Sequence, residues 1–244
     1  MISIIIPLYN EEENVLLYPK QLIPVAESII RQYGEDCEFV FVDDGSRDNT
    51  LERLNALKEG TPHVTVVPHG TNKGMGAAIR TGLAHARGHL IITMDSDLTY
   101  RPEDIDTLLA AYRDTKADCI SASPYRGGDH ANEVSSPFRL FISRAVNFLY
   151  RLLLGNDITC VSGIFRLYKK EALLELTLRS NNFEIDAEII SKLILGGRTV
   201  REVGVKLHER EYGESKLDVK KEVRNNLKIL SKIFRARLLK ESWD

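Results

Sequence analysis

The sequence predicts an α/β fold in which a mostly parallel sheet carries helices on both faces. First, short apolar runs rich in Val and Ile alternate with amphipathic stretches over residues 1–121. Second, polar clusters follow several of these runs, at the edge of the sheet where such folds bind ligands. Third, 244 residues with 43% hydrophobic and 28% charged side chains suit one globular domain with a short addition, and exclude a disordered or collagen-like chain.

Five apolar runs have the length and composition of buried strands. They are Ile2–Leu8, Glu38–Val42, Val64–Val67, Leu90–Met94 and Asp118–Ser121. The stretches between them have the periodicity of helices: 12–33, 48–59, 73–87 and 102–115. Asp48 and Pro102 stand where helices are expected to start, and Pro19 and Pro24 predict breaks in the first helical region.

The second half of the chain follows a different pattern. A glycine-rich loop at 124–132, a long helix at about 137–154 and a loop at 155–163 precede a strand, two helices and a basic C-terminal helix. No apolar run reaches the roughly 18 residues of a membrane span, and the first ten residues indicate a strand rather than a signal peptide. Three widely spaced cysteines fit a reducing compartment, so we expect a cytoplasmic protein.

The net charge of −2 is unevenly distributed along the chain. The segment 216–240 holds nine Lys or Arg against Asp218 and Glu222, which gives it a charge of +7 and leaves −9 for the rest. Such a basic segment indicates either an anionic partner or surface, or simply a solvated helix face. Its cations are not interleaved with aromatic residues, so we expect no nucleic-acid partner.

Three polar clusters follow predicted strands and are expected to meet at one edge of the sheet: 7–11, 43–46 and 95–97. Asp95 and Asp97, separated by one residue, could hold Mg²⁺ or Mn²⁺ and leave coordination positions for substrate phosphates. Such a metal would neutralise a diphosphate leaving group, whereas the alternative is an acidic turn before a helix. Because Asp48 can cap the next helix, Asp44 would be free to accept hydrogen bonds from a nucleoside.

The segment 72–78 is rich in glycine and alanine and precedes a predicted helix. It is only loosely similar to a dinucleotide-binding loop, because the third glycine is missing and the segment follows the third strand instead of the first. We expect its small residues to let the helix pack closely on the sheet. An NAD-dependent oxidoreductase or a sugar nucleotidyltransferase would need a glycine-rich loop after the first strand, where residues 7–11 stand.

Taken together, the motifs resemble those of family 2 glycosyltransferases, which have the GT-A fold. The segments that carry this resemblance are 7–11, 42–50, 72–82 and 95–97. Four further segments are similar to the dolichol-phosphate mannose synthase branch, namely 143–147, 162–166, 183–188 and 210–216. The resemblance covers about 2–217. It implies a catalytic domain over 1–216, with a nucleotide-sugar-binding half at 1–121 and an acceptor half at 122–216, followed by a basic helix at 217–244.

The resemblance also implies roles for individual residues. The residues that would contact the nucleoside are Pro7, Tyr9, Glu11, Val42 and Asp44. Asp95, Ser96 and Asp97 would bind the diphosphate, with Asp95 and Asp97 as ligands of Mg²⁺ or Mn²⁺. Arg210 and Lys216 would hold phosphate groups, and Glu188 would lie near the sugar; with Asp97 these form the catalytic set. Ser143 and Arg144 would lie near the acceptor.

Two departures from the family pattern concern the acceptor. Proline stands at position 124, where the family usually has a phosphate-binding arginine, and Arg126 is a candidate to replace it. The segment 162–166 has one extra residue, and the aspartate that usually precedes it is replaced by Thr159, with Asp157 the nearest carboxylate.

The implied reaction is a metal-dependent, inverting transfer of mannose or glucose from GDP-mannose or UDP-glucose to a polyprenyl phosphate, dolichyl or undecaprenyl. An acceptor that is already anionic needs orientation rather than a general base. A sugar hydroxyl acceptor would need a base, for which Asp186 and Glu188 are candidates. A non-catalytic nucleotide-sugar-binding module is the alternative from another class.

The predicted helix 137–154 has an apolar face and a face with three arginines. An apolar face of this kind can pack on a core or lie in a membrane interface. The family resemblance favours the membrane, so we expect a peripheral protein on the cytoplasmic face, with a possible membrane partner subunit.

Overall fold

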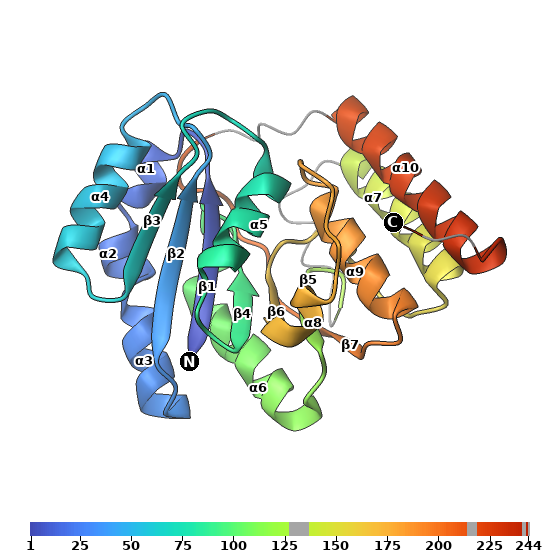
Figure 1. Cartoon of the computed structure of the whole chain (residues 1–244), viewed down its shortest axis with the longest axis horizontal. Helices are drawn as coiled ribbons and strands as arrows, with labels where there is room; N and C mark the ends of the chain where they lie inside the picture. Colours follow the sequence, from blue (N-terminus) through green and yellow to red (C-terminus); the bar gives the residue numbers. More distant parts are fainter. Residues whose placement is uncertain (127–136, 214–218, 241–242, 244) are drawn as a thin grey trace.

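A computed structural model describes residues 1–126, 137–213, 219–240 and Trp243, with side chains described except at 137–143 and 219–222. In this part of the chain, seven strands form one sheet in the order β3-β2-β1-β4-β6-β5-β7 (Figure 1). Their bounds are β1 Ile2–Leu8, β2 Cys37–Asp43, β3 Val64–Pro68, β4 Leu90–Thr93, β5 Cys119–Ser123, β6 Arg166–Lys169 and β7 Val200–Gly204. Only β6 runs antiparallel to its neighbours β4 and β5, so the predicted mostly parallel sheet is confirmed.

Helices cover both faces of this sheet. They are α1 Glu12–Val15, α2 Tyr18–Gln21, α3 Pro24–Tyr33, α4 Thr50–Gly60, α5 Met75–His85, the 3-10 turn η1 Pro102–Asp104, α6 Ile105–Thr115, α7 Pro137–Leu154, α8 Lys170–Leu174, α9 Ile185–Leu195 and α10 Val219–Leu238. Pro19 and Pro24 lie in the first turns of α2 and α3, which confirms the predicted breaks. The predicted cap at Asp48 is one residue early, because Asn49 occupies that position.

The side chains of β1 alternate between two hydrophobic clusters. Ile4 and Ile6 pack with residues of α2, α3, α4 and α6, whereas Ile5 packs with residues of α5, α7, α9 and α10. All three are completely buried, and each contributes on the order of 2 kcal/mol through the removal of apolar surface from water. The alternation fixes which side of the strand faces which helices, and therefore holds the end of β1 in place.

Helix α5 packs directly on the sheet through a small residue. Gly82 is buried, and a Cβ at this position would overlap Cγ2 of Ile5 in β1. Gly82 lies near the end of the helix, outside the segment 72–78 for which close packing on the sheet was expected.

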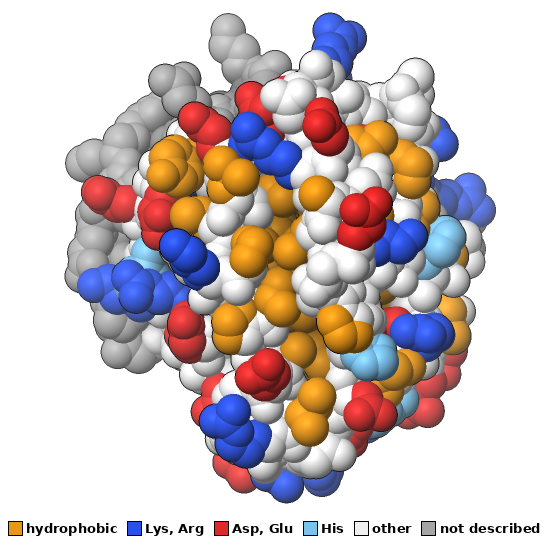
Figure 2. All heavy atoms as spheres, turned by 90° about the vertical axis from the view of Figure 1, so that its left-hand side faces the viewer, with side chains coloured by type: hydrophobic (Ala, Val, Ile, Leu, Met, Phe, Trp, Pro, Cys, Tyr) orange, Lys and Arg blue, Asp and Glu red, His pale blue; other side chains and the backbone are white. Residues whose placement is uncertain are grey.

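The helices α7 and α10 lie side by side at one end of the molecule (Figure 1). The predicted long helix and the basic C-terminal helix are both present, whereas β7 has no counterpart among the predicted strands. Figure 2 shows the end that carries α1–α4, where a band of hydrophobic side chains is interrupted by charged side chains of both signs. Among the described residues, no helix is long and apolar enough to cross a membrane.

Candidate active site

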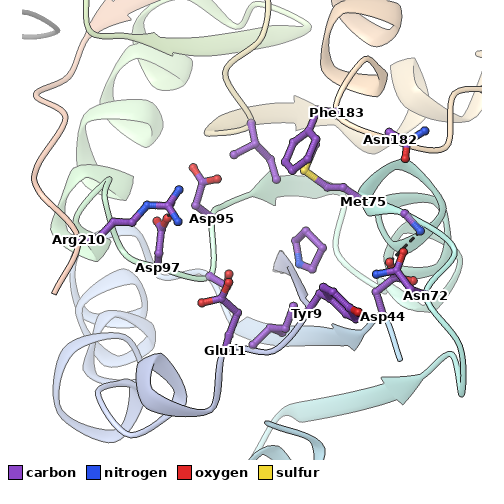
Figure 3. A pocket seen from close by; sticks show the side chains of 15 residues that line it. Tyr9, Glu11, Asp44, Asn72, Met75, Asp95, Asp97, Asn182, Phe183 and Arg210 are labelled. Atoms are coloured by element: carbon purple, nitrogen blue, oxygen red, sulfur yellow. Dashed lines mark hydrogen bonds and ion pairs between the residues drawn. The ribbon is translucent and has the colours of Figure 1, made fainter. Parts of the chain in front are cut away.

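The carboxyl ends of β1, β2 and β4 meet where the strand order reverses. The chain passes from β1 to β2 and β3 on one side, and then crosses to β4 on the other side of β1. Open α/β sheets bind ligands at such a switch point. A cavity of about 300 Å³ opens there (Figure 3). Its lining residues are Pro7, Leu8, Tyr9, Glu11, Asp44, Asn72, Gly74, Met75, Asp95, Ser96, Asp97, Ile164, Asn182, Phe183 and Arg210.

Asp95 and Asp97, from the turn after β4, form an acidic side of this cavity together with Glu11 (Figure 3). Asp97 is buried; its Oδ2 lies 2.9 Å from Nη2 of Arg210, and its Oδ1 accepts the N–H of Thr99 at 3.1 Å. Burial and the negative charge of Asp97 raise the pKa of Asp95 well above its usual range, and Arg210 offsets this only in part. A cation would therefore stabilise the ionised pair.

Tyr18 holds the backbone of the turn that carries Asp95 and Asp97. Its hydroxyl donates to the carbonyl oxygen of Ser96 at 2.7 Å, and its ring stacks on Phe41 of β2 with a centroid separation of 5.4 Å. The side chain is completely buried, so α2 and β2 together hold the backbone at Ser96 in one position. Nothing in the sequence pattern distinguishes Tyr18 from an ordinary core residue.

Asp44 lies at the other end of the cavity and is held by three protein groups. Its Oδ1 accepts the N–H of Lys73 at 2.9 Å and lies 2.7 Å from Nδ1 of His69, while its Oδ2 accepts the N–H of Gly74 at 2.8 Å. Asp44 does not cap α4, but its carboxylate fastens the glycine-rich segment to the end of β2. A carboxylate offers about four acceptor positions, so capacity for a further donor remains.

The glycine-rich segment packs against the loop before α9. Gly74 has φ +93°, and a Cβ there or on Gly76 would collide with the backbone carbonyls of Ser180 and Asn181. The N–H of Gly76 donates to the carbonyl oxygen of Asn181 at 2.8 Å. This contact brings Asn182 and Phe183 into the cavity wall. These two glycines thus serve close approach to a second loop, whereas close packing on the sheet was expected.

Glu188, a predicted catalytic residue, does not line the cavity. It is completely buried, its carboxylate accepts the backbone N–H groups of Arg179 and Ser180, and its Oε1 lies 3.4 Å from Nζ of Lys192. Its visible role is to hold the loop before α9. Val42 is likewise completely buried in the core rather than exposed in the cavity, because side chains alternate along β2.

Arg126 also lies outside the cavity. Its guanidinium is 3.2 Å from Oδ2 of Asp157 and 3.7 Å from Oε2 of Glu202. Burial raises the pKa of Glu202, although hydrogen bonds from Thr159 and the N–H of Cys160 oppose this. Arg126 is therefore engaged by two carboxylates, neither of which lines the cavity.

Arg144 lines a separate open groove of about 450 Å³. The other lining residues of this groove are Tyr125, Asn147, Phe148, Arg151 and Thr159. The side chain of Ser143 and all of Lys216 lie outside the described residues. The structure therefore brings most of the predicted nucleotide and metal residues together in one cavity, and places the predicted acceptor residue Arg144 beside another.

The side chains at the acidic side suit a hard divalent cation. Two carboxylates one residue apart supply oxygen ligands, and both line an open cavity in which a substrate could supply the others. In the described part of the chain, no group of three or more His, Cys, Asp or Glu side chains forms a complete metal cage. A cation held here would thus depend on ligands from water or substrate.

Several lining residues were not singled out from the sequence. Four of them, Met75, Ile164, Asn182 and Phe183, line the cavity. A fifth residue, His69, does not line it but contacts the carboxylate of Asp44. These residues come from segments whose approach depends on tertiary packing. Met75, Ile164 and Phe183 do lie in segments that carry the family resemblance, 72–82, 162–166 and 183–188, whereas Asn182 and His69 lie outside them.

An open, mostly parallel sheet with an acidic cavity at its switch point is typical of enzymes that use nucleotide-linked substrates. A family model, "Glycosyl transferase family 2", matches residues 3–177, and the chain belongs to this family.

Solved structures give the same fold. Glucosyl-3-phosphoglycerate synthase from Mycobacterium tuberculosis, in complex with Mn²⁺, uridine diphosphate and phosphoglyceric acid, superimposes with a TM-score of 0.69 at 18% identity, covering 97% of this chain and 78% of the other. The same enzyme crystallised with Mn²⁺, UDP-glucose and phosphoglyceric acid gives a TM-score of 0.65 at 17% identity, covering 97% and 79%. The GT-A-type fold expected from the resemblance is thereby confirmed.

Proposed function

We propose that the protein transfers a hexose, mannose or glucose, from a nucleotide sugar to a polyprenyl phosphate. The observation that carries this proposal is that Asp44, Asp95, Asp97 and Arg210 line one cavity at the switch point of the sheet. The family supports glycosyl transfer, and a structural neighbour was crystallised with UDP-glucose and Mn²⁺. The donor is UDP-glucose or GDP-mannose, with its nucleoside towards Asp44 and Tyr9.

In this proposal Asp95 and Asp97 hold Mg²⁺ or Mn²⁺. Bound there, the ion would act as a Lewis acid that neutralises the diphosphate. Arg210, 2.9 Å from Asp97, is placed to hold a phosphate oxygen once a cation satisfies the aspartate. An oxygen of the acceptor phosphate attacks the anomeric carbon, and the bond from that carbon to the diphosphate breaks. The electron pair leaves with the nucleoside diphosphate, and one displacement inverts the anomeric centre.

A phosphate acceptor fits the described side chains better than a sugar hydroxyl does. A hydroxyl needs a general base, and neither Asp186 nor Glu188 lines the cavity. Arg144 and Arg151 of α7 line a groove with Phe148, which offers two cations and an apolar contact to a lipid phosphate. We assign donor binding to 1–121 and acceptor binding to 122–216.

Membrane attachment is the second part of the proposal. The α7–α10 ridge, as we call the exposed apolar residues of these two helices, comprises Phe148, Leu149, Leu152, Leu227, Phe234 and Leu238, which are 42–67% exposed. Tyr150, on the opposite side of α7, is completely buried and donates to Asn226 Oδ1 of α10. Among the described side chains of α7, Asn147 and Tyr150 are thus buried while several apolar side chains are exposed, which suits the interface of a cytoplasmic membrane leaflet. A membrane partner subunit could cover the same surface.

The test is transfer of radiolabelled sugar from UDP-glucose or GDP-mannose into the lipid phase, with undecaprenyl or dolichyl phosphate as acceptor and Mn²⁺ present. We expect label in the lipid phase with one donor, and none with Asp97→Ala. Label that appears only in a soluble sugar would favour the hydroxyl acceptor instead. Donor binding without release of nucleoside diphosphate under any acceptor would favour a non-catalytic binding module.

A further inference from the structure

A second groove, of about 360 Å³, lies between the loop before α9 and the helix α10. Four cationic side chains face it: Arg179 from the loop, and Arg224, Lys228 and Lys232 from successive turns of α10. The other lining residues are Ser180, Asn181, Asn182, Glu184, Asn225 and Ile229. Positions 224, 228 and 232 are four residues apart, so they form one stripe along the helix.

The positive charge of this groove is not neutralised by the described residues. Within them, none of the four cationic side chains forms an ion pair with a carboxylate. The single acidic residue in the lining, Glu184, offsets only one of the four positive charges; its Oε2 accepts from Asn225 at 3.0 Å and its Oε1 from the N–H of Asn182 at 3.4 Å. Four like charges around one hollow repel one another, and an anion placed between them would relieve that repulsion.

The groove and the cavity of the candidate active site share a wall. Asn182 lines both, and Phe183, the next residue, lines the cavity. The loop between them is stiffened by Glu188, which accepts the N–H groups of Arg179 and Ser180, and by Arg80, which donates to Ser180 and Asn181. A ligand in the groove therefore contacts the back of the loop whose front faces the donor pocket.

We propose that this groove is a second binding site, for a phosphate-bearing anion, distinct from the donor cavity. Arginine and lysine side chains at helical spacing, together with the amide groups of Asn181 and Asn182, offer charge-assisted hydrogen bonds to phosphate oxygens. The anion is either a free phosphate compound or the headgroup of an anionic lipid. An anion bound there would contact the loop whose Asn182 also lines the donor pocket.

The experiment uses the full-length protein and two probes, inorganic phosphate in solution and vesicles of phosphatidylcholine with or without phosphatidylglycerol. The groove variant is Lys228→Gln with Lys232→Gln. The matched control is Lys20→Gln with Lys58→Gln, which removes the same charge from exposed positions of α2 and α4. Amide shifts in nuclear magnetic resonance spectra report where phosphate binds, and sedimentation reports vesicle binding. Thermal unfolding shows whether each variant is folded.

We expect inorganic phosphate to shift the amides of Arg179, Asn181 and Arg224, and the groove variant to weaken this binding by about tenfold, the effect of about 1.4 kcal/mol. If vesicle binding requires phosphatidylglycerol and is lost in the groove variant but kept in the control, the occupant is a lipid headgroup. Shifts confined to Asp95–Asp97, or equal losses in the groove and control variants, would overturn the proposal. So would the absence of binding of both probes to the wild type.

Discussion

The carboxylate of Asp44 depends on a neighbour that does not itself touch the cavity. His69 has a side chain that is 4% exposed, and it stands between Asp44 and Thr81, with Nε2 2.8 Å from the threonine hydroxyl. Because this arrangement orients Asp44 and, through it, the N–H groups of Lys73 and Gly74, His69 acts as a positioning residue for the nucleoside end of the site.

We predict that His69→Ala raises the donor KM by about tenfold, the cost of about one hydrogen bond to a charged group, while kcat changes little. His69→Gln should recover part of the loss, because its amide can still donate to Asp44. His85→Ala, at an exposed histidine of α5, is the control. An unchanged donor KM in His69→Ala would contradict the positioning role.

Among individual residues, the sequence allowed us to predict the site residues that come directly after a strand. Asp95 and Asp97 could be found because buried β4 ends two residues before Asp95 and four before Asp97, and parallel strands end at one edge of the sheet. Arg126 could not be placed, because its partners come from distant segments whose approach only the fold defines. Glu188 has partners close in the sequence, but the course of the loop that brings the N–H groups of Arg179 and Ser180 to it could not be predicted. Asp44 was found, but its bonds to the glycine-rich segment were not.

At the scale of elements, the strands were predictable because buried parallel strands are short runs of Val, Ile and Phe. β7 was not predicted because its sequence, Val200–Gly204, contains the adjacent charged residues Arg201 and Glu202, and only Val200 is buried. The break of the first helical region followed from Pro19 and Pro24, whose rings restrict the backbone locally.

The close contact of α5 with β1 predicts that substitution of one glycine, Gly82, destabilises the protein. Gly82→Ala places a methyl group against Ile5, which is completely buried and cannot move aside. We predict a loss of about 1–3 kcal/mol in the free energy of unfolding, measured by urea denaturation. Gly60→Ala, near the end of α4 with no atom close to the added methyl group, should change stability by less than about 1 kcal/mol. Equal effects of the two substitutions would contradict the close packing of α5.

A buried glutamate joins β1, β2 and the turn before β4. Glu38 accepts from Ser3 Oγ at 2.6 Å and from the N–H and Nε of Arg87 at 2.6 and 2.7 Å. Burial alone would raise the pKa of Glu38, but these hydrogen bonds outweigh burial and lower it.

Because the folded-state pKa is the lower one, the stability that Glu38 contributes is present above the unfolded glutamate pKa of about 4.3 and is lost as pH falls through the folded value. We predict that Glu38→Gln is less stable than the wild type at pH 7, and that the difference shrinks in acid. Urea denaturation at several pH values measures this. A difference that stays constant down to acid pH would contradict the assignment.

At the scale of the whole molecule, the sequence predicted the fold and the location of the cavity but not the surfaces. The periodicity of helix 137–154 allowed a core role or a membrane role, and only the packing of α7 against α10 reveals which apolar side chains remain exposed. A single sequence does not specify which helix faces meet.

The α7–α10 ridge gives a prediction at this scale. Phe148→Ser with Leu152→Ser should reduce sedimentation with phosphatidylcholine–phosphatidylglycerol vesicles several-fold, because these side chains are 62% and 67% exposed and would insert their apolar surface into the interface. Leu16→Ser with Ile30→Ser, at exposed positions of the other end of the molecule, is the matched control. Equal vesicle binding by both double variants would contradict a membrane role for the ridge.

The central claim is that Asp95 and Asp97 hold a divalent cation that binds the diphosphate of the donor. The most direct measurement is calorimetric titration of UDP and GDP into the protein, with Mn²⁺ or with a chelator. For the wild type, we predict that Mn²⁺ tightens binding of one nucleotide by about tenfold or more, and that Asp97→Asn abolishes this gain. Nucleotide binding that is equally tight with chelator, or a gain from Mn²⁺ that persists in Asp97→Asn, would contradict the account.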